Sequence, residues 1–270
     1  MYMSTGIEVT PERQEYLRRT RRHRIVVVGI QASLLLLFFL LWEEAARLRW
    51  IDPFITSQPS RIVRTIINLH QDGSLYLHIY VTLMETFVSF LLGAAGGTLT
   101  AVLLWWSHTL DEISEPYLVV LNALPKVALG PVLIVWLGNG STAIIGMALL
   151  ISIIVTIINL VSGFKEVDPD KIKLLKAFGA SRRQVLTKVV LPASLPVMTS
   201  TLKVNVGLCL VGVIMGEFLV SRAGLGYLIV YGSQVFKLDL VMSSILILAV
   251  IAALMYFMVS FFEHVTRGHV

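Results

Sequence analysis

Three charged residues stand inside long apolar runs of the sequence: Glu85, Lys126 and Lys203. A charged side chain held in an apolar environment usually faces a cavity, a partner or the route of a polar solute. The chemistry that these residues offer is therefore recognition and passage of a polar molecule. For Glu85 and Lys203 a second interpretation stays open, because each lies near the end of its run and can extend its polar group toward water.

Lys126 lies nearer the middle of its run, beside a residue that interrupts helices. Asn122 and Lys126 are four residues apart and so share one helix face, and Pro125 removes a backbone hydrogen bond between them. Broken helices near the centre of a bilayer often build substrate sites. We expect Asn122, Pro125 and Lys126 to line a translocation pathway, with Asn205 and Glu217 as further candidates.

The sequence carries no pattern of a known catalytic or metal centre. It has no H-E-x-x-H, no paired aspartates in the apolar runs, and no base placed to activate Ser152 or Ser243. It also lacks the G-x-x-x-x-G-K-[ST] loop that cradles nucleotide phosphates. Cys209 is the single cysteine, which excludes an intramolecular disulfide. We expect no enzyme, no metal site and no nucleotide bound by this chain.

Composition places the chain in a membrane. Apolar residues make up 56% of 270 positions, charged residues 14%, and the mean hydropathy is +0.80. Soluble domains carry about 25% charged residues, which they need to face water. The net charge of +5 lies in blocks beside apolar runs, as in cytoplasmic segments of membrane proteins, rather than in a nucleic-acid-binding surface.

The apolar runs predict an all-α membrane protein with about six transmembrane helices. A polar tail, residues 1–24, precedes the first run, which is too long for the apolar region of a signal peptide. A short amphipathic helix over 61–70 is expected between the first two spans. The expected spans are 25–42, 79–106, 117–137, 142–162, 194–216 and 240–262.

Two spans carry local features. Gly93 and Gly97 in the second span have the G-x-x-x-G spacing that lets a neighbouring helix approach closely. Pro125, Gly130 and Pro131 predict that the third span is broken or kinked.

The loops predict the orientation. With the N-terminus inside, the inner segments hold 14 lysines and arginines and the outer segments hold 6. Because cytoplasmic loops carry the excess of basic residues, both termini are expected in the cytoplasm.

One long polar segment, residues 163–192, interrupts the apolar pattern. Asp168 is a good helix cap before Pro169, and Gly179 stands where a helix ends in a left-handed residue. A second helix restarts at the capping box Ser181–Gln184. The segment thus predicts two short helices around a glycine turn, with Ile172, Leu175 and Phe178 on one apolar face. A basic loop resting on lipid headgroups would explain the charge but not the two caps, so we favour a docking role.

This segment resembles the EAA motif, E-A-A-x3-G-x9-I-x-L-P, of permeases of binding-protein-dependent ABC importers. Gly179 takes the glycine position, and Val189, Leu191 and Pro192 take the positions of I-x-L-P. Lys173-Leu174-Leu175 replaces E-A-A, which leaves the helix geometry intact but removes the acidic group.

Two further stretches strengthen the resemblance. Ala123–Pro131, followed by Val135-Trp-Leu-Gly138, is similar to the third-span motif of sulfonate, taurine, nitrate and bicarbonate permeases. Gly216-Glu217, followed by Gly224–Ile229, is similar to the stretch after their fifth span. The similarity covers roughly residues 60–265, which we interpret as the permease domain.

The resemblance implies a MetI-like, type I ABC importer permease in the bacterial inner (cytoplasmic) membrane. Its implied partners are a second permease copy, identical or different, cytoplasmic ATPases that use ATP, and an extracytoplasmic solute-binding protein. The residues implied to contact the ATPase are Ile172, Lys173, Leu175, Phe178, Gly179, Ala180, Ser181, Leu191 and Pro192.

The transported solute stays open. Similar permeases carry small anions such as nitrate, sulfonate or taurine, or ring compounds such as thiamine precursors and riboflavin. An ion-coupled secondary transporter is the alternative function. It would need intramembrane carboxylates and often an internal repeat, of which the sequence offers only Glu85 and no clear repeat.

Overall fold

The computed structural model describes the backbone of residues 11–267 and the side chains of residues 19–261. Every regular element in these residues is a helix. Five of these helices are long and apolar enough to cross a membrane, and a bent pair of shorter helices makes a sixth crossing if it is counted as one span. The predicted all-α membrane fold is confirmed.

The chain divides into two compact units, Met1–Val63 and Arg64–Val270. The described part of the first unit contains α1 (Pro11–Arg47), α2 (Pro53–Thr56) and the start of α3 (Pro59–Gln71). Helix α1 is longer than the anchor predicted over 25–42. Its basic first half contains no proline or glycine after Pro11 and continues the helix, since arginine and glutamate are good helix formers.

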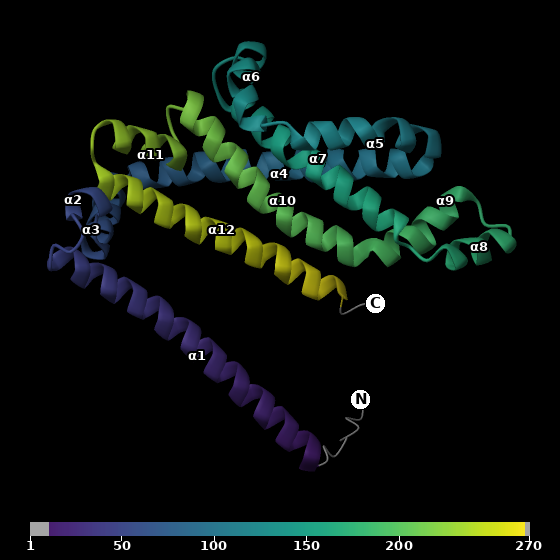
Figure 1. Ribbon diagram of the computed structural model, residues 1–270, viewed down its shortest axis with the longest axis horizontal. Helices are drawn as coiled ribbons and strands as arrows, with labels where there is room; N and C mark the ends of the chain where they lie inside the picture. Colours follow the sequence, from purple (N-terminus) through teal and green to yellow (C-terminus); the bar gives the residue numbers. More distant parts are fainter. Residues whose placement is uncertain (1–10, 268–270) are drawn as a thin grey trace, which may run out of the picture. The chain divides into compact units, whose positions relative to one another are not determined.

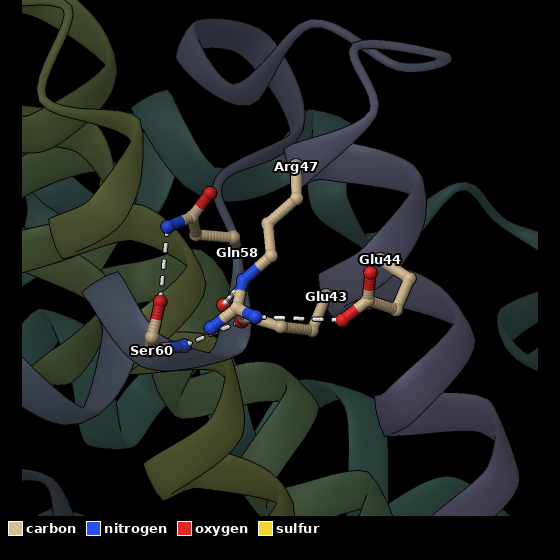
Figure 2. Close-up of polar contacts among 5 residues, drawn as sticks. All are labelled: Glu43, Glu44, Arg47, Gln58 and Ser60. Atoms are coloured by element: carbon tan, nitrogen blue, oxygen red, sulfur yellow. Dashed lines mark hydrogen bonds and ion pairs between the residues drawn. The ribbon is translucent and has the colours of Figure 1, made fainter.

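Glu43, near the end of α1, makes the polar contacts that organise this unit (Figure 2). Its Oε2 atom accepts a hydrogen bond of 3.0 Å from the backbone N–H of Ser60, and its Oε1 atom lies 3.2 Å from Arg47 Nε. Arg47 also contacts Glu44, and the Gln58 amide donates to the Ser60 hydroxyl. Ser60 lies in the first turn of α3, where free N–H groups favour a carboxylate. Glu43 therefore caps α3 from 17 positions away.

The second unit holds the remaining helices. They are α4 (Ser74–Trp106), α5 (His108–Ala123), the 3₁₀ turn η1 (Lys126–Leu129), α6 (Gly130–Leu137), α7 (Ser141–Lys165), α8 (Pro169–Ala177), α9 (Arg182–Val185), the π-helical turn η2 (Leu186–Val190), α10 (Leu191–Val220), α11 (Leu225–Gln234) and α12 (Leu238–Arg267). Helix α7 packs along α4 and α10, and α8 and α9 lie together at one end of α7 and α10 (Figure 1).

Small residues bring the central helices close together. A Cβ atom on Gly97 of α4 would lie 2.6 Å from Thr156 Cγ2 of α7, and one on Gly212 of α10 would lie 2.4 Å from Ala148 Cα of α7. Any larger side chain at these positions would push the helices apart. The close approach predicted for the G-x-x-x-G spacing of α4 is therefore confirmed.

The third span is broken, as its prolines predict. Helices α5 and η1–α6 are bent by 87° at the break. Leu124 has the extended backbone that a following proline favours. Helix α5 begins at His108, before Tyr117, where the third span was expected to start. Ser107 caps the helix by accepting from the N–H of Leu110, so the charged stretch expected as a loop is helical.

Two connections also differ from expectation. The stretch expected as a loop, residues 217–239, contains the end of α10 and the whole of α11. The predicted second short helix of segment 163–192 does not end before the fifth span. Helix α9 continues through η2 into α10, so that residues 182–220 form one run of 39 helical residues.

Candidate functional site

The helix–turn–helix predicted for segment 163–192 is formed by α8 and α9. Asp168 accepts a hydrogen bond of 2.9 Å from the N–H of Asp170, and Pro169 is the first residue of α8. Gly179 has φ = +78°, the left-handed conformation expected of it. A Cβ atom there would meet nothing within 4 Å, so the turn requires glycine because of its backbone angle and not because of crowding.

The second helix begins with the predicted capping box. The Gln184 N–H donates to Ser181 Oγ at 3.4 Å, and the Ser181 N–H donates to Gln184 Oε1 at 2.7 Å. The Ser181 side chain is thereby used within its own helix.

The apolar residues of α8 point in two directions. Ile172 and Leu175 are half-buried and, with Ala180, pack against a core cluster that includes Phe164 and Val190. The expectation that Ile172, Leu175 and Phe178 share one outward face is therefore wrong. The outward apolar pair is Leu174, 56% exposed, and Phe178, 83% exposed. The backbone position of Phe178 just before the glycine turn carries its side chain away from the core.

The other residues expected at this surface lie around the pair or behind it. Lys173 is exposed and binds Asp170 Oδ1 at 2.9 Å. Leu191 is half-buried and packs against the same core cluster, whereas Pro192 is exposed at the start of α10.

Arg182, the first residue of α9, contacts the end of α4. Its guanidinium lies 5.8 Å from the ring centroids of both Trp105 and Trp106, and it donates to the Trp105 carbonyl at 3.5 Å. Cation–π contacts of this kind stabilise by about 0.5–1 kcal/mol at exposed sites. The contact attaches the helix–turn–helix to α4.

A second contact attaches the same end of the bundle to the broken span. Lys165, at the end of α7, lies 2.7 Å from Asp111 Oδ2 and 4.0 Å from Glu115 Oε2 of α5. The end of α7 and the beginning of α5 therefore lie together, as the predicted topology requires of residues 107–116 and 163–192.

Three of the residues expected in the pathway, Asn122, Pro125 and Lys126, lie at the break between α5 and η1. Lys126 Nζ donates to the Asn122 carbonyl at 2.9 Å and approaches Asn122 Oδ1 at 3.5 Å, so the two residues are neighbours as predicted. Asn122 and Pro125 are exposed, and Lys126 is half-buried in η1. Among the described side chains of α5, none is buried.

Glu217 of α10 is buried within the helix bundle. It is 1% exposed and is surrounded by donors. Thr82 Oγ1 of α4 donates to its Oε1 atom at 2.6 Å, and the N–H of Gly226 donates to its Oε2 atom at 2.5 Å. The Thr82 hydroxyl in turn accepts from the N–H of Leu225 at 2.8 Å. The carboxylate therefore holds the N-terminus of α11 against α4 and α10, where free N–H groups favour negative charge.

Two more contacts complete this arrangement. The N–H of Gly224 donates to His78 Nδ1 of α4 at 3.0 Å, and the ring of His78 stacks on Tyr227. His78 is thus a buried structural partner, not the solvated side chain that its sequence position suggests. A Cβ atom on Gly226 would lie 2.7 Å from Glu217 Oε2, which explains the glycine of the motif.

Asn205 also lies in the interior of the helix bundle. It is buried on α10, where its Oδ1 atom accepts from Cys209 Sγ at 3.2 Å, and it lies near Gly93. Lys203 lies 5.6 Å from the ring centroid of Tyr256 on α12. In the described residues there is no group of three or more histidine, cysteine, aspartate or glutamate side chains suited to hold a metal.

The sequence matches the family of binding-protein-dependent transport system inner membrane components over residues 93–267. A relative from Haemophilus influenzae, named a probable ABC transporter permease protein, is 30% identical over 89% of this chain and 94% of its own length. The formylaminopyrimidine transport permease of Halalkalibacterium halodurans is 27% identical, over 71% of this chain and 76% of its own. The taurine transport system permease of Escherichia coli is 24% identical, over 84% and 85%.

The fold is also that of a solved importer. A chain of the methionine ABC transporter MetNI in inward-facing conformations superposes with a TM-score of 0.62 and 19% identity. The similarity covers 70% of this chain and 94% of that one. The expected MetI-like architecture is confirmed.

We predict that Thr82→Val destabilises the helix bundle. The change keeps the volume but leaves Glu217 Oε1 and the N–H of Leu225 without their partner, and a buried group left unpaired loses about 1–3 kcal/mol. Thermal unfolding of the purified chain in detergent measures the effect. Thr86→Val is the matched control, since Thr86 is equally buried but donates only to a carbonyl of its own helix. Equal losses in the two variants would contradict the role of the Glu217 contacts.

Proposed function

Because the chain belongs to the family of binding-protein-dependent transport system inner membrane components, we propose that it couples solute passage to a separate ATPase through α8 and α9. The chain is an ABC importer permease subunit and a transport protein, not an enzyme. The observation that carries the coupling proposal is the exposed pair Leu174 and Phe178 on a capped helix–turn–helix whose second helix continues into α10.

The exposed pair fits a protein partner better than a lipid surface. Leu174 and Phe178 lie on a segment that also exposes Lys171, Lys173 and Lys176. An apolar anchor with a charged rim is the composition of a protein interface centre. The partner proposed here is the ATPase, with a cleft that receives Phe178. Ile172, Leu175 and Ala180 support the pair from behind by packing on the core.

The coupling is proposed to be mechanical. Helix α9 passes into α10 without a loop, and Arg182 joins it to the end of α4. A tilt of α8 and α9 imposed by the ATPase would therefore move α10 and α4 directly. The Lys165–Asp111 ion pair would extend the movement to α5.

The broken span is the proposed pathway element. Asn122 and Lys126 offer polar groups at the break, and none of the described side chains of α5 is buried. We propose that a second permease copy, identical or different, completes the pathway along this span. The binding protein would deliver solute at the end opposite to α8 and α9.

The orientation follows from the basic residues of the loops. The end that carries α8 and α9 is proposed to face the cytoplasm of a bacterial inner membrane, where ATP is available to the partner. Both termini are proposed to be cytoplasmic as well. The solute is proposed to be a nitrate-, sulfonate- or taurine-like anion, or a ring compound such as a thiamine precursor or riboflavin. Relatives named for taurine and for formylaminopyrimidine support both classes.

Cysteine labelling tests this orientation. With Cys209 replaced by serine, a membrane-impermeant thiol reagent added to intact cells is expected to label Gln234→Cys and to miss Ala177→Cys. Gln234 on α11 and Ala177 on α8 are both exposed in this structure. A difference in labelling would therefore report the side of the membrane and not burial within the protein. Labelling of Ala177→Cys before the cells are opened would reverse the proposed topology.

We predict that Phe178→Ala and Leu174→Ala weaken ATPase binding at least tenfold without preventing insertion. Removing a central apolar anchor typically lowers binding energy by about 2 kcal/mol or more. The measurement is recovery of the ATPase on the immobilised permease. Phe236→Ala is the control, because Phe236 is 71% exposed on the connection between α11 and α12. Wild-type recovery by both variants would show that the pair does not dock the ATPase.

Gly179 tests the geometry of coupling separately from contact. We predict that Gly179→Val abolishes transport in vesicles, since a β-branched residue is strained at φ = +78°, by about 1–2 kcal/mol. Gly179→Asn should retain much of the activity, because asparagine tolerates left-handed backbone. Neither side chain meets a crowded site. If asparagine and valine reduce uptake equally, the backbone conformation is not the cause.

A further inference from the structure

A polar cavity lies at the end of α7 opposite to α8 and α9. Its volume is about 530 Å³, within the range of about 300–1,000 Å³ typical of small-molecule sites. The cavity lies between α4, the start of α7 and the turn that precedes α11. The polar residues that line it are Glu85, Asn139, Ser141, Ser221 and Arg222.

Glu85 is the residue in this cavity that the rest of the chain leaves unsatisfied. It is 5% exposed, and neither of its carboxylate oxygens has a hydrogen-bond partner among the described residues. Ser141 and Glu217 are its polar neighbours and contribute weak polar contacts, but neither meets the distance and angle of a hydrogen bond to it. Glu217, in contrast, receives donors on both oxygens. Of the two buried glutamates of this region, Glu217 is therefore held by partners within the chain and Glu85 is not.

A buried carboxyl group without a partner takes up a proton, and it is ionised only when a donor or a cation reaches it. The cavity is the open route to Glu85, since Glu85 forms part of its wall. Arg222, an exposed guanidinium, lines the same cavity. Guanidinium groups bind carboxylate, sulfonate and phosphate oxygens. One cavity thus presents a group for a cation and a group for an anion.

We propose that this cavity binds a small zwitterionic solute, with its protonated amine on Glu85 and its acidic group on Arg222. The inference rests on the proposed import function and specifies the class of solute. It is narrower than the anions and ring compounds named above, because it requires an amine. Asn139, Ser141 and Ser221 supply further hydrogen bonds along the cavity wall.

Three compounds with the same two-carbon chain separate the two charges. Taurine carries an amine and a sulfonate, ethanesulfonate lacks the amine, and ethylamine lacks the sulfonate. Calorimetric titration of each into the full chain in lipid nanodiscs measures their affinity. Taurine is expected to bind at least tenfold more tightly than either single-charge compound.

Two variants assign the charges to residues. Glu85→Gln should lower taurine affinity at least tenfold and leave the affinity for ethanesulfonate unchanged. Arg222→Gln should lower the affinity for taurine and ethanesulfonate and leave that for ethylamine unchanged. The matched controls are Glu112→Gln on α5 and Arg64→Gln on α3, both exposed and outside the cavity. Neither control should alter any affinity.

A second measurement does not depend on substituting Glu85. In a Cys209→Ser background, Ser141→Cys places a thiol in the cavity wall, and its rate of alkylation reports access. Taurine should slow this reaction more than ethanesulfonate or ethylamine does. This measurement tests the site even if the Glu85→Gln variant fails to fold.

Several outcomes would overturn the inference. They are equal affinities for the three compounds, no binding of any of them, binding of taurine that is indifferent to Glu85, or displacement of taurine by sodium chloride and choline chloride alike. Recovery of the ATPase on the permease separates failure of the zwitterion site from failure of the proposed function. A chain that binds its ATPase but shows any of these outcomes keeps the proposed function and loses the zwitterion site. A chain that binds taurine but no ATPase loses the proposed function instead.

Discussion

The carboxylate of Glu217 is the contact on which one end of the helix bundle depends. A buried carboxylate needs donors on both oxygens, and here they come from Thr82 on α4 and from the first turn of α11. Glu217 itself belongs to α10, so three helices must converge for it to be satisfied. The glycines at 224 and 226 allow the backbone to approach it. The contact therefore sets the position of α11 and the walls of the neighbouring cavity, including the unpaired Glu85.

The other end of the bundle is held by the apolar core cluster around Phe164 and Val190, with polar contacts added at its surface. Arg182 contacts the tryptophans that end α4, and Lys165 pairs with Asp111 of α5. Such contacts are individually weak and exchange readily. In the proposed coupling, movement of α8 and α9 has to pass from this end of the bundle to the other. The uninterrupted passage of α9 into α10 is the connection between them.

Local rules predicted the turns of segment 163–192 and the break at Pro125, because caps, left-handed glycine and proline act within a few residues. They failed for the outward face of α8. Helical spacing grouped Ile172, Leu175 and Phe178, but the helix ends at Ala177, so Phe178 no longer follows that spacing. They also failed for the start of α5, where the charged residues Asp111 and Glu115 suggested a loop. Their partner Lys165 lies on another helix, and its positive charge offsets the negative charge of Asp111 and Glu115.

The sequence by itself determined that this protein lies in a membrane, that it has about six apolar spans, how segment 163–192 turns and to which family it belongs. Those properties depend on composition and on short-range pattern. The tertiary structure alone decided which polar residues are already paired. Glu217 meets Thr82 across 135 positions, and His78 meets Gly224 across 146. No periodicity encodes such distant partners, so Glu217 resembled a pathway residue, and the unsatisfied state of Glu85 appeared only when the helices were packed.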